Sequence, residues 1–339
     1  MTSFRRNTLR DVADRAGVSY QTVSRVINHH PYVAEETRVR VLDAIAALGY
    51  QPNKVAQSLA GRRSQTLAVI TFGMDYYGPA QMVINIEHAA KAAGYDLIFA
   101  NIAQPNSDSI RAAMARLGRW QVDGMILITP VPGIDYEDIA GQQPHTPLVL
   151  MDAPLGSTTP SVVVDQGYGG RLVTQHLIDL GHHALCEISG PLDWFGAVAR
   201  HQSWLDTLHE AGLKPGLSIE GDWTALGGYH AARRLLDSGA PFTGLVVGND
   251  QMALGALRAM HERGLRIPED VSVVGFDDIP EACCFEPPLT TVRQDFDSLG
   301  RQGITYLVER IEAPDTPVAQ RVIYPELVVR ASTAPPRPS

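Results

Sequence analysis

Residues 8–28 carry the pattern that most constrains the fold, two short amphipathic helices separated by a tight turn. Apolar side chains recur at helical spacing from Leu9 to Ala16 and again from Val23 to Ile27. Between the two runs, Gly17 can take the left-handed conformation that ends a helix. Ser19 can then cap the next helix by accepting a hydrogen bond from one of its free amides. The spacing predicts a helix-turn-helix.

The outward-facing residues of the second predicted helix are of the kinds that read DNA bases. The residues off its apolar face are Tyr20, Gln21, Thr22 and Arg25. In a helix-turn-helix the start of the second helix enters the major groove, where glutamine matches adenine and arginine matches guanine. A packed helix pair with an ordinary polar surface would have the same spacing, so this stretch alone leaves both interpretations open.

Charge is distributed unevenly along the chain. Residues 1–63 hold 10 Lys and Arg against 5 Asp and Glu, and the remaining residues hold 18 against 32. A basic segment on an acidic body is suited to phosphate contact at one end only. The three cysteines do not suggest a disulfide framework, and we find neither a signal peptide nor a membrane-spanning apolar run. We therefore expect a cytoplasmic protein with no membrane contact.

The chain divides into four predicted segments. These are a helix-turn-helix head over 1–52, a short helix and linker over 53–64, a body over 65–333 and a proline-rich disordered tail over 334–339. A helix as short as the second segment would be unfolded in water by itself. That segment is therefore either a flexible linker or a helix that folds only against a partner.

The head needs a third helix to complete its core, and we predict it over 34–48. The apolar stripe expected on this helix consists of Val33, Val39, Leu42, Ile45 and Leu48. Gly49 follows the stripe and is expected to end the helix.

The body alternates between short apolar runs and amphipathic helices. Strands are predicted over 66–72, 95–101, 124–129, 147–151, 161–164, 184–189, 244–248 and 271–276. Helices are predicted over 79–93, 168–180, 197–211, 227–238 and 250–263. This alternation predicts an α/β body of parallel sheets flanked by helices, and the number of strands favours two similar lobes. Such sheets bind ligands at the carboxyl ends of their strands.

Polar residues follow several of these strands. Asp152, Asn249 and Asp277 come directly after apolar runs, and Arg200 and Trp223 follow glycine-containing turns. Carboxylate, amide and guanidinium groups can fix the hydroxyls of a sugar, and an aromatic ring can cover its apolar face. A single aspartate at such a position commonly caps a helix. The prediction of a sugar site therefore depends on these side chains meeting in one cleft.

Two segments carry a resemblance to a known family. The sequence GVSYQTVSRVIN at 17–28 and the pattern PN-x-VA-x-x-LAG at 52–61 resemble the lactose repressor family of bacterial transcription regulators. The resemblance extends over most of the chain. It implies a two-lobed body like that of periplasmic sugar-binding proteins, with a sugar effector in the cleft. It also implies a hinge helix that forms on DNA, with Leu59 inserted between base steps.

The resemblance assigns roles residue by residue. The DNA contacts that it implies are Thr8, Leu9, Ser19, Tyr20, Gln21, Thr22, Ser24, Arg25, Asn28, Asn53, Val55, Ala56, Gln57, Leu59 and Ala60. The effector contacts that it implies are Tyr76, Gly78, Pro79, Met82, Asp152, Arg200, Trp223, Asn249, Asp277, Gln294 and Phe296.

The walls of the implied effector site depart from the family pattern. Ile128 stands in place of an asparagine and Val164 in place of a phenylalanine, and Trp194 and Phe195 are additional aromatic residues before Arg200. A galactoside-type sugar that releases the protein from its operator is the expected effector. The alternatives are a regulator that responds to another sugar or a purine, and a sugar-binding protein without a regulatory role.

No catalytic or metal-binding constellation emerges from the sequence. The glycine-rich stretch at 167–170 does not complete a dinucleotide-binding fingerprint, and no activated nucleophile or base is evident. We expect no enzymatic activity, no cofactor and no metal. The chain ends without the leucine-heptad helix that joins dimers into tetramers in one member of the family that it resembles. This implies a homodimer, which would read a pseudo-palindromic operator.

Overall fold

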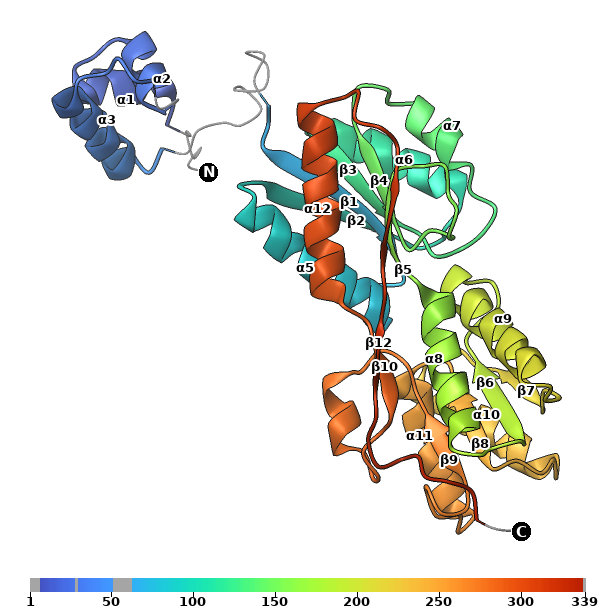
Figure 1. Ribbon diagram of the computed structural model, residues 1–339. Coiled ribbons are helices and arrows are strands. Elements are labelled where there is room, and N and C mark those ends of the chain that lie inside the picture. The colour runs from blue at the N-terminus through green and yellow to red at the C-terminus, as the bar shows by residue number, and fades with distance from the viewer. Residues whose placement is uncertain (1–6, 28–29, 51–62, 338–339) are drawn as a thin grey trace, which may run out of the picture. The chain divides into compact units, whose positions relative to one another are not determined.

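The computed structural model describes residues 7–27, 30–50 and 63–337 (Figure 1). They belong to two compact units, one ending at Ser64 and the other beginning at Gln65. Within these ranges, no helix has both the length and the apolar composition needed to cross a bilayer. The predicted DNA contacts that lie outside the described residues are Asn28, Asn53, Val55, Ala56, Gln57, Leu59 and Ala60.

The small unit packs α1 (Leu9–Ala16), α2 (Tyr20–Ile27) and α3 (Glu35–Leu48) around one core. Thr8 and Asp11 form a reciprocal capping box at the start of α1, and Gly17 ends that helix with a φ of 65°. Ser19 Oγ accepts a hydrogen bond from the backbone N–H of Thr22 at 3.1 Å. The helix-turn-helix and both of its predicted caps are therefore confirmed.

The stripe predicted for α3 is wrong in two positions. Val39 and Leu42 are 47% and 50% exposed, whereas Val41 and Ala44 are buried against α1 and α2. The packed face of α3 is thus centred on 41, 44, 45 and 48, a spacing of three and four residues. Alanine carries too weak a hydrophobic signal to mark that face. The larger but exposed Val39 and Leu42 were therefore assigned to the packed face instead.

Residues 65–337 form two lobes, each built on a parallel sheet. The six-stranded lobe has the strand order β11-β5-β4-β3-β1-β2. Its strands are β1 (Thr66–Phe72), β2 (Asp96–Ile102), β3 (Gly124–Ile128), β4 (Leu148–Met151), β5 (Ser161–Val164) and β11 (Gln320–Ile323). Helices α5 (Tyr77–Ala92) and α12 (Phe296–Glu312) cover one face, and α6 (Ser107–Gly118) and α7 (Tyr136–Gly141) cover the other (Figure 1).

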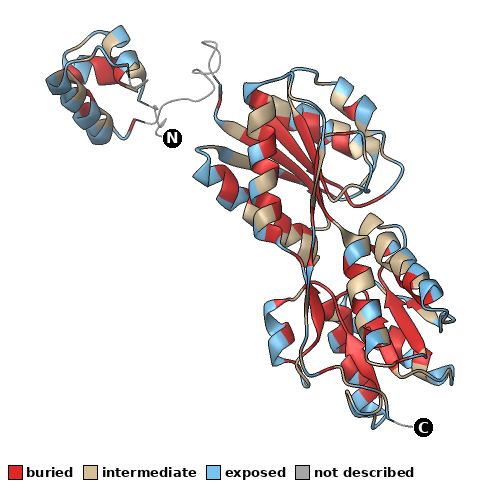
Figure 2. Cartoon of the chain, in the orientation of Figure 1, coloured by how far each residue is buried: buried red, intermediate tan, exposed pale blue. Residues whose placement is uncertain are grey.

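Successive side chains of a strand point to opposite faces of its sheet, which explains this arrangement. Leu67 and Val69 of β1 pack with α5 and α12, whereas Ala68 and Ile70 pack with α6. Because helices cover both faces, the central strands β1, β3, β4 and β5 read as continuous apolar runs, and Figure 2 shows them buried along most of their length. The edge strands β2 and β11 are more exposed.

The four-stranded lobe has the strand order β7-β6-β8-β9. Its strands are β6 (Leu185–Ser189), β7 (Ser218–Glu220), β8 (Gly244–Val247) and β9 (Ser272–Val274). Helices α8 (Gln166–Asp179) and α9 (Phe195–Glu210) pack on one face. Helices α10 (Ala225–Asp237) and α11 (Asp250–Glu262) pack on the other, and the short 3-10 helix η1 (Pro280–Cys284) follows β9.

Within residues 65–337, the chain passes between the lobes after β5, after β10 and after β11. Strands β10 (Thr291–Arg293) and β12 (Glu326–Val328) form an antiparallel pair beside the four-stranded lobe. The two-lobed architecture of parallel sheets flanked by helices is as predicted. Strands β7, β10, β11 and β12 were not predicted, because these short strands mix polar with apolar residues and form no continuous apolar run.

The last described residues differ from the disordered tail predicted over 334–339. Ala334 donates its N–H to Ser272 Oγ at 3.0 Å, and its carbonyl is hydrogen-bonded to His182 Nε2 at 2.9 Å. Arg337 pairs with Asp270 at 3.0 Å. Residues 334–337 therefore continue the packing of the four-stranded lobe, because their backbone has partners that a proline-rich composition does not reveal.

Candidate functional site

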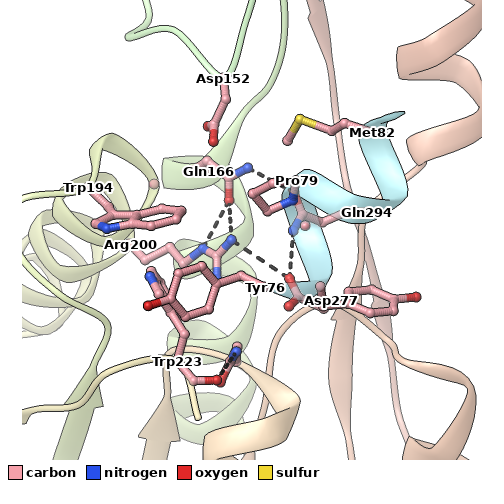
Figure 3. A pocket seen from close by; sticks show the side chains of 14 residues that line it. Tyr76, Pro79, Met82, Asp152, Gln166, Trp194, Arg200, Trp223, Asp277 and Gln294 are labelled. Atoms are coloured by element: carbon pink, nitrogen blue, oxygen red, sulfur yellow. Dashed lines mark hydrogen bonds and ion pairs between the residues drawn. The ribbon is translucent and has the colours of Figure 1, made fainter. Parts of the chain in front are cut away.

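A pocket lies between the two lobes, where the carboxyl ends of the strands of both sheets meet (Figure 3). It contains about 490 Å³ of atom-free space, including its open mouth. The residues that line it are Tyr76, Tyr77, Gly78, Pro79, Met82, Asp152, Gln166, Trp194, Gly196, Arg200, Trp223, Asn249, Asp277 and Gln294. The structure thus brings together all but one of the effector contacts implied by the resemblance.

Phe296 is the exception, and the structure corrects its assignment. Its side chain is buried in the core of the six-stranded lobe, and it does not belong to the pocket lining. Its ring packs edge-on against Tyr77, with the ring centroids 6.0 Å apart. Phe296 is the first residue of α12, which packs on the sheet, so its side chain points into the core. Tyr77 lines the pocket, and Phe296 supports it from behind.

Three pocket residues have backbone conformations that are unusual outside glycine. Asp152, Trp223 and Asp277 have φ angles of 59°, 69° and 112°. Asp152 follows β4, Trp223 follows β7 and Asp277 follows β9, so each lies where a strand ends in the cleft. Such conformations cost about 1–3 kcal/mol each and persist where the surrounding structure imposes them. These three side chains are therefore held toward the pocket at a cost in folding stability.

Hydrogen bonds and one ion pair join four polar side chains into a cycle on the floor of the pocket (Figure 3). This polar network consists of Gln166, Arg200, Asp277 and Gln294. Gln166 Oε1 accepts from Arg200 Nε at 2.9 Å and Nη2 at 2.7 Å, and Gln166 Nε2 donates to Gln294 Oε1 at 2.8 Å. Gln294 Nε2 donates to Asp277 Oδ1 at 2.6 Å, which lies 3.8 Å from Arg200 Nη2. A ligand would meet donors and acceptors whose positions are already fixed.

The guanidinium of Arg200 is enclosed by the four-stranded lobe. It lies over the ring of Phe276, 3.6 Å from the centroid, and 5.5 Å from that of Trp223, and it donates to the carbonyl of Gly248. Its side chain is 13% exposed and that of Asp277 is 7% exposed. Burial lowers the pKa of Arg200, and the nearby Asp277 and Asp152 oppose this effect. The pair thus places a desolvated cation and a desolvated carboxylate beside the cavity.

Asp152 faces this pair from the six-stranded lobe (Figure 3). Among the described residues, no protein group donates a hydrogen bond to its carboxyl. Burial raises the pKa of Asp152 to about 6, although Arg200 opposes the shift. Burial likewise raises the pKa of Asp277 to about 6, opposed by Arg200 and by the hydrogen bond from Gln294. Both carboxyls would be stabilised in their charged form by a ligand that donates hydrogen bonds.

The neighbouring acidic residues Asp250 and Asp278 have structural roles instead. Asp250 is fully buried at the start of α11, where it accepts from Thr291 Oγ1 at 2.6 Å and from the N–H of Ile279 at 2.9 Å. Asp278 pairs with Arg293 at 2.7 Å and with Arg330. In the pairs Asn249–Asp250 and Asp277–Asp278, the first side chain lines the pocket. The second makes structural contacts that fix the segment.

Asn249 both caps a helix and lines the pocket. Its Oδ1 accepts from the N–H of Met252 at 2.9 Å and so caps α11, while the residue also lines the pocket. Its Nδ2 donates to the carbonyl of Trp223 at 3.1 Å. The ordinary capping interpretation of a strand-end polar residue and the ligand-site interpretation are thus compatible here.

Three aromatic rings gather at one end of the pocket (Figure 3). This aromatic corner consists of Tyr76 from the six-stranded lobe and Trp194 and Trp223 from the four-stranded lobe. The ring of Trp194 is nearly perpendicular to that of Tyr76, at 88°, and inclined by 70° to that of Trp223. The Nε1 of Trp223 is buried and has no hydrogen-bond partner among the described residues.

Gln166 lines the pocket but was not among the predicted effector contacts. It comes two residues after β5, at the start of α8. The strand-end argument that selected Asp152 and Asp277 applies equally to this position. The sequence signal was therefore present at Gln166, in the gap between the strand predicted to 164 and the helix predicted from 168.

In the small unit, the described DNA-contact candidates lie around the start and outer face of α2. Tyr20, Gln21 and Arg25 are exposed, and Thr22 and Ser24 are half-buried. The hydroxyls of Ser19 and Thr22 lie 2.9 Å apart. Thr8 and Leu9 begin α1, where Thr8 is occupied in capping. The arrangement leaves one amide and one guanidinium on the same helix face, free to reach base edges. Among the described residues, no cluster of three potential metal ligands occurs.

Comparison with known families assigns both units. Residues 8–53 match the model of bacterial regulatory proteins of the lacI family. Residues 174–333 match a periplasmic binding protein-like domain. The first match covers the helix-turn-helix, and the second covers most of the four-stranded lobe and the last crossings.

Individual relatives extend this similarity over nearly the whole chain. The chain is 37% identical to the lactose operon repressor of Escherichia coli strain K12 over 302 residues, covering 89% of this chain and 84% of that protein. It is 35% identical to the repressor PurR of Pasteurella multocida strain Pm70 over 328 residues, covering 96% and 98%.

Among solved structures, the Lac repressor dimer bound to operator and the anti-inducer ONPF superposes with a TM-score of 0.90 at 35% identity, covering 97% of this chain and all of that one. A complex of the regulator CelR with cellobiose superposes with a TM-score of 0.73 at 33% identity, covering 96% and 100%. The curated relatives are named as repressors, so this protein is a regulator and not an enzyme. The chain belongs to the lacI family of bacterial regulatory proteins.

Proposed function

We propose that this protein is a transcriptional repressor that binds its operator as a homodimer and releases it when a galactoside-type sugar occupies the pocket. The observation that carries the proposal is the opposition of Asp152, on one lobe, to the polar network on the other. Sugar hydroxyls both donate and accept hydrogen bonds, and these carboxylates, amides and the guanidinium supply matching partners. The proposal requires no metal and no cofactor.

The aromatic corner favours a sugar over a purine. A planar base is best held between parallel aromatic faces or against one broad face. The rings of Tyr76, Trp194 and Trp223 meet at steep angles and form a corner instead. In addition, Asp152 and Asp277 face the cavity from the two lobes, where hydroxyl donors above and below a puckered ring would satisfy both.

The regulatory step follows from the position of the pocket between the lobes. A ligand that contacts both lobes binds most tightly to one arrangement of them, and it can shift the equilibrium only by the difference between its affinities for the two arrangements. Operator release requires that the sugar-bound arrangement separate the two helix-turn-helix units of a dimer. Gln21 and Arg25 of each unit would then no longer reach successive major grooves together.

An electrophoretic mobility shift titration tests the proposal. The operator would first be selected from random duplexes by the full-length protein, and the complex would then be titrated with methyl β-galactoside, lactose, allolactose, isopropyl thiogalactoside, glucose, cellobiose and hypoxanthine. We expect release by at least one galactoside and no release by hypoxanthine. Release by hypoxanthine alone would support the purine alternative, and release by none of these compounds would refute sugar induction.

Effector binding should weaken as the pH falls through about 6. The pKa values of Asp152 and Asp277 are raised to about 6 by burial in the ligand-free pocket. Hydroxyls that donate to these carboxylates stabilise the charged form, so binding lowers both pKa values. Above about pH 6 the carboxylates are already ionised and the affinity is constant. Below it, each must lose a proton to bind, and the affinity falls by up to about tenfold per pH unit for each carboxyl.

Isothermal titration calorimetry between pH 5 and 8 would measure this dependence, with the heat in buffers of different ionisation enthalpy reporting proton release. Asp152→Asn should reduce the number of protons released by about one half at pH 6 and by nearly one at about pH 5. An affinity that stays constant from pH 7 to 5 would contradict a direct contact between the sugar and these carboxyls.

A further inference from the structure

Trp194 joins the two lobes at the aromatic end of the pocket. It is the residue before α9, in the four-stranded lobe, yet its ring packs against Phe72 and Tyr76 of the six-stranded lobe, at centroid distances of 5.8 and 5.2 Å. On its own lobe it packs against Trp223 at 5.9 Å. The indole therefore fills the space between the lobes at this end and leaves no gap there for a second ligand ring.

The tryptophan rings of the aromatic corner are seated on two glycines. A Cβ atom at Gly73 would lie 3.0 Å from Cη2 of Trp194, and Gly73 has a φ of 77°. A Cβ atom at Gly190 would lie 2.1 Å from Cη2 of Trp223, so that ring rests directly on backbone. The ring of Trp223 therefore occupies space that only glycine leaves open, and the ring of Trp194 packs closely against the opposite lobe at Gly73.

The backbone beside Trp194 is tied across the cleft as well. The N–H of Phe195 donates to the carbonyl of Pro130 at 2.7 Å, and Pro130 follows β3 in the six-stranded lobe. This link is separate from the chain crossings that follow β5, β10 and β11. It holds the start of α9, and with it the backbone next to Trp194, close to the opposite lobe.

The other end of the pocket is lined by the six-stranded lobe. Pro79 and Met82 of α5 lie there (Figure 3). The polar network lies between these residues and the aromatic corner. The polar part of the site is thus bounded at both ends.

We propose that Trp194 is a specificity-determining residue that limits the effector to a single sugar ring, a monosaccharide or its small alkyl glycoside, and excludes disaccharides. The inference rests on the proposed function, because it assumes that the polar network holds sugar hydroxyls. The ring of the effector lies over the polar network and ends against the aromatic corner. A second pyranose linked to it on the side of the aromatic corner has to displace the indole, break the contacts with Phe72 and Tyr76, and separate the lobes. This is discrimination by steric exclusion.

Matched sugar pairs test the size limit by isothermal titration calorimetry with the full-length protein. The pairs are methyl β-galactoside with lactose and methyl β-glucoside with cellobiose, since each disaccharide carries at its non-reducing end the ring of its partner. We expect the wild type to bind the one-ring member of its preferred pair at least about 100-fold more tightly, a ratio typical of steric exclusion. In Trp194→Ala this ratio should fall by at least about tenfold, because the space beyond the corner opens.

Two further variants separate the size limit from a general loss of structure. Trp194→Phe keeps an aromatic ring at the corner and should give an intermediate ratio, and it serves in place of the alanine variant if that protein does not fold. Trp120→Ala removes an exposed tryptophan of the six-stranded lobe that does not line the pocket, and its ratio should equal that of the wild type. A mere loss of stability would weaken both members of a pair equally and leave the ratio unchanged.

The outcomes distinguish the two proposals. Binding of methyl β-glucoside but of no galactoside refutes the galactoside effector, and the glucose pair then decides the role of Trp194. Equal binding of one-ring and two-ring sugars by the wild type overturns the size limit while leaving the sugar effector intact. A ratio that is the same in Trp194→Ala as in the wild type also overturns it. Binding of no sugar of either pair overturns both proposals.

Discussion

Replacing Asp277 by asparagine should leave operator binding intact and abolish the response to the effector. The carboxyl accepts from Gln294 and lies beside the buried guanidinium of Arg200. The amide keeps the shape of the side chain but removes the charge, so the guanidinium loses its nearest anion and the ligand loses its acceptor. Loss of one partner from a buried charged pair costs about 2–5 kcal/mol, which is roughly 30-fold to several thousand-fold in affinity. Calorimetry and operator titration would measure the two activities separately.

Asp278→Asn provides a matched control one residue away. Asp278 belongs to the same segment and is equally buried, but its carboxylate pairs with Arg293 and Arg330 and does not line the pocket. This variant should lower the melting temperature and change the effector affinity by less than about threefold, because its contacts are structural. If both variants lost effector affinity to the same extent, a general disturbance of the segment after β9 would explain the result better than a contact at Asp277.

Replacing Arg25 by alanine should have the opposite effect, a loss of operator binding with the effector site unchanged. Arg25 is exposed on α2, one turn after the equally exposed Gln21. Loss of a bidentate arginine contact to a guanine costs about 1–3 kcal/mol per site and relaxes the sequence preference at that base pair. Both halves of a palindrome would be affected in a dimer, so the total loss is about twice as large in free energy. Competition between specific and random duplexes at fixed salt would measure it.

Arg40→Ala is the control for charge in this experiment. Arg40 is exposed on α3 of the same unit, so its removal changes the net charge of the head equally but takes away no residue of α2. We expect specific and random duplexes to be weakened alike, by less than about threefold at moderate salt. Equal losses of specificity in the two variants would exclude base reading by Arg25.

The sequence predicted the parts of the fold where a repeating pattern runs long enough. Continuous apolar runs predicted β1 and β5 with their bounds as observed, because helices cover both faces of the sheet and each side chain must be apolar. The caps at Gly17 and Ser19 were predicted for the same kind of reason, since each position needs a particular backbone or side-chain chemistry. Local physics is sufficient in these places.

What the sequence did not reveal depends on contacts between distant segments. The packed face of α3 is set by Val41 and Ala44 against α1 and α2, and small residues give no periodic signal. Phe296 lies in the core and Tyr77 lines the pocket in front of it, because the direction of α12 decides which way the ring of Phe296 points. The polar network could be assembled only in three dimensions, as its glutamines at 166 and 294 lie on different crossings.

The two lobes contribute unequally to the pocket, and this difference sets the order in which a ligand contacts them. Arg200, Asp277 and Asn249 all belong to the four-stranded lobe and are held in place by it, whereas the opposite lobe offers Asp152 and a largely apolar roof. An incoming molecule can therefore dock on one half first, with the rate of encounter set by that half. The residence time of the ligand then depends on how tightly the six-stranded lobe contacts it. Substitutions in the six-stranded lobe would mainly change the rate of ligand dissociation. Substitutions in the four-stranded lobe would mainly change the rate of ligand association.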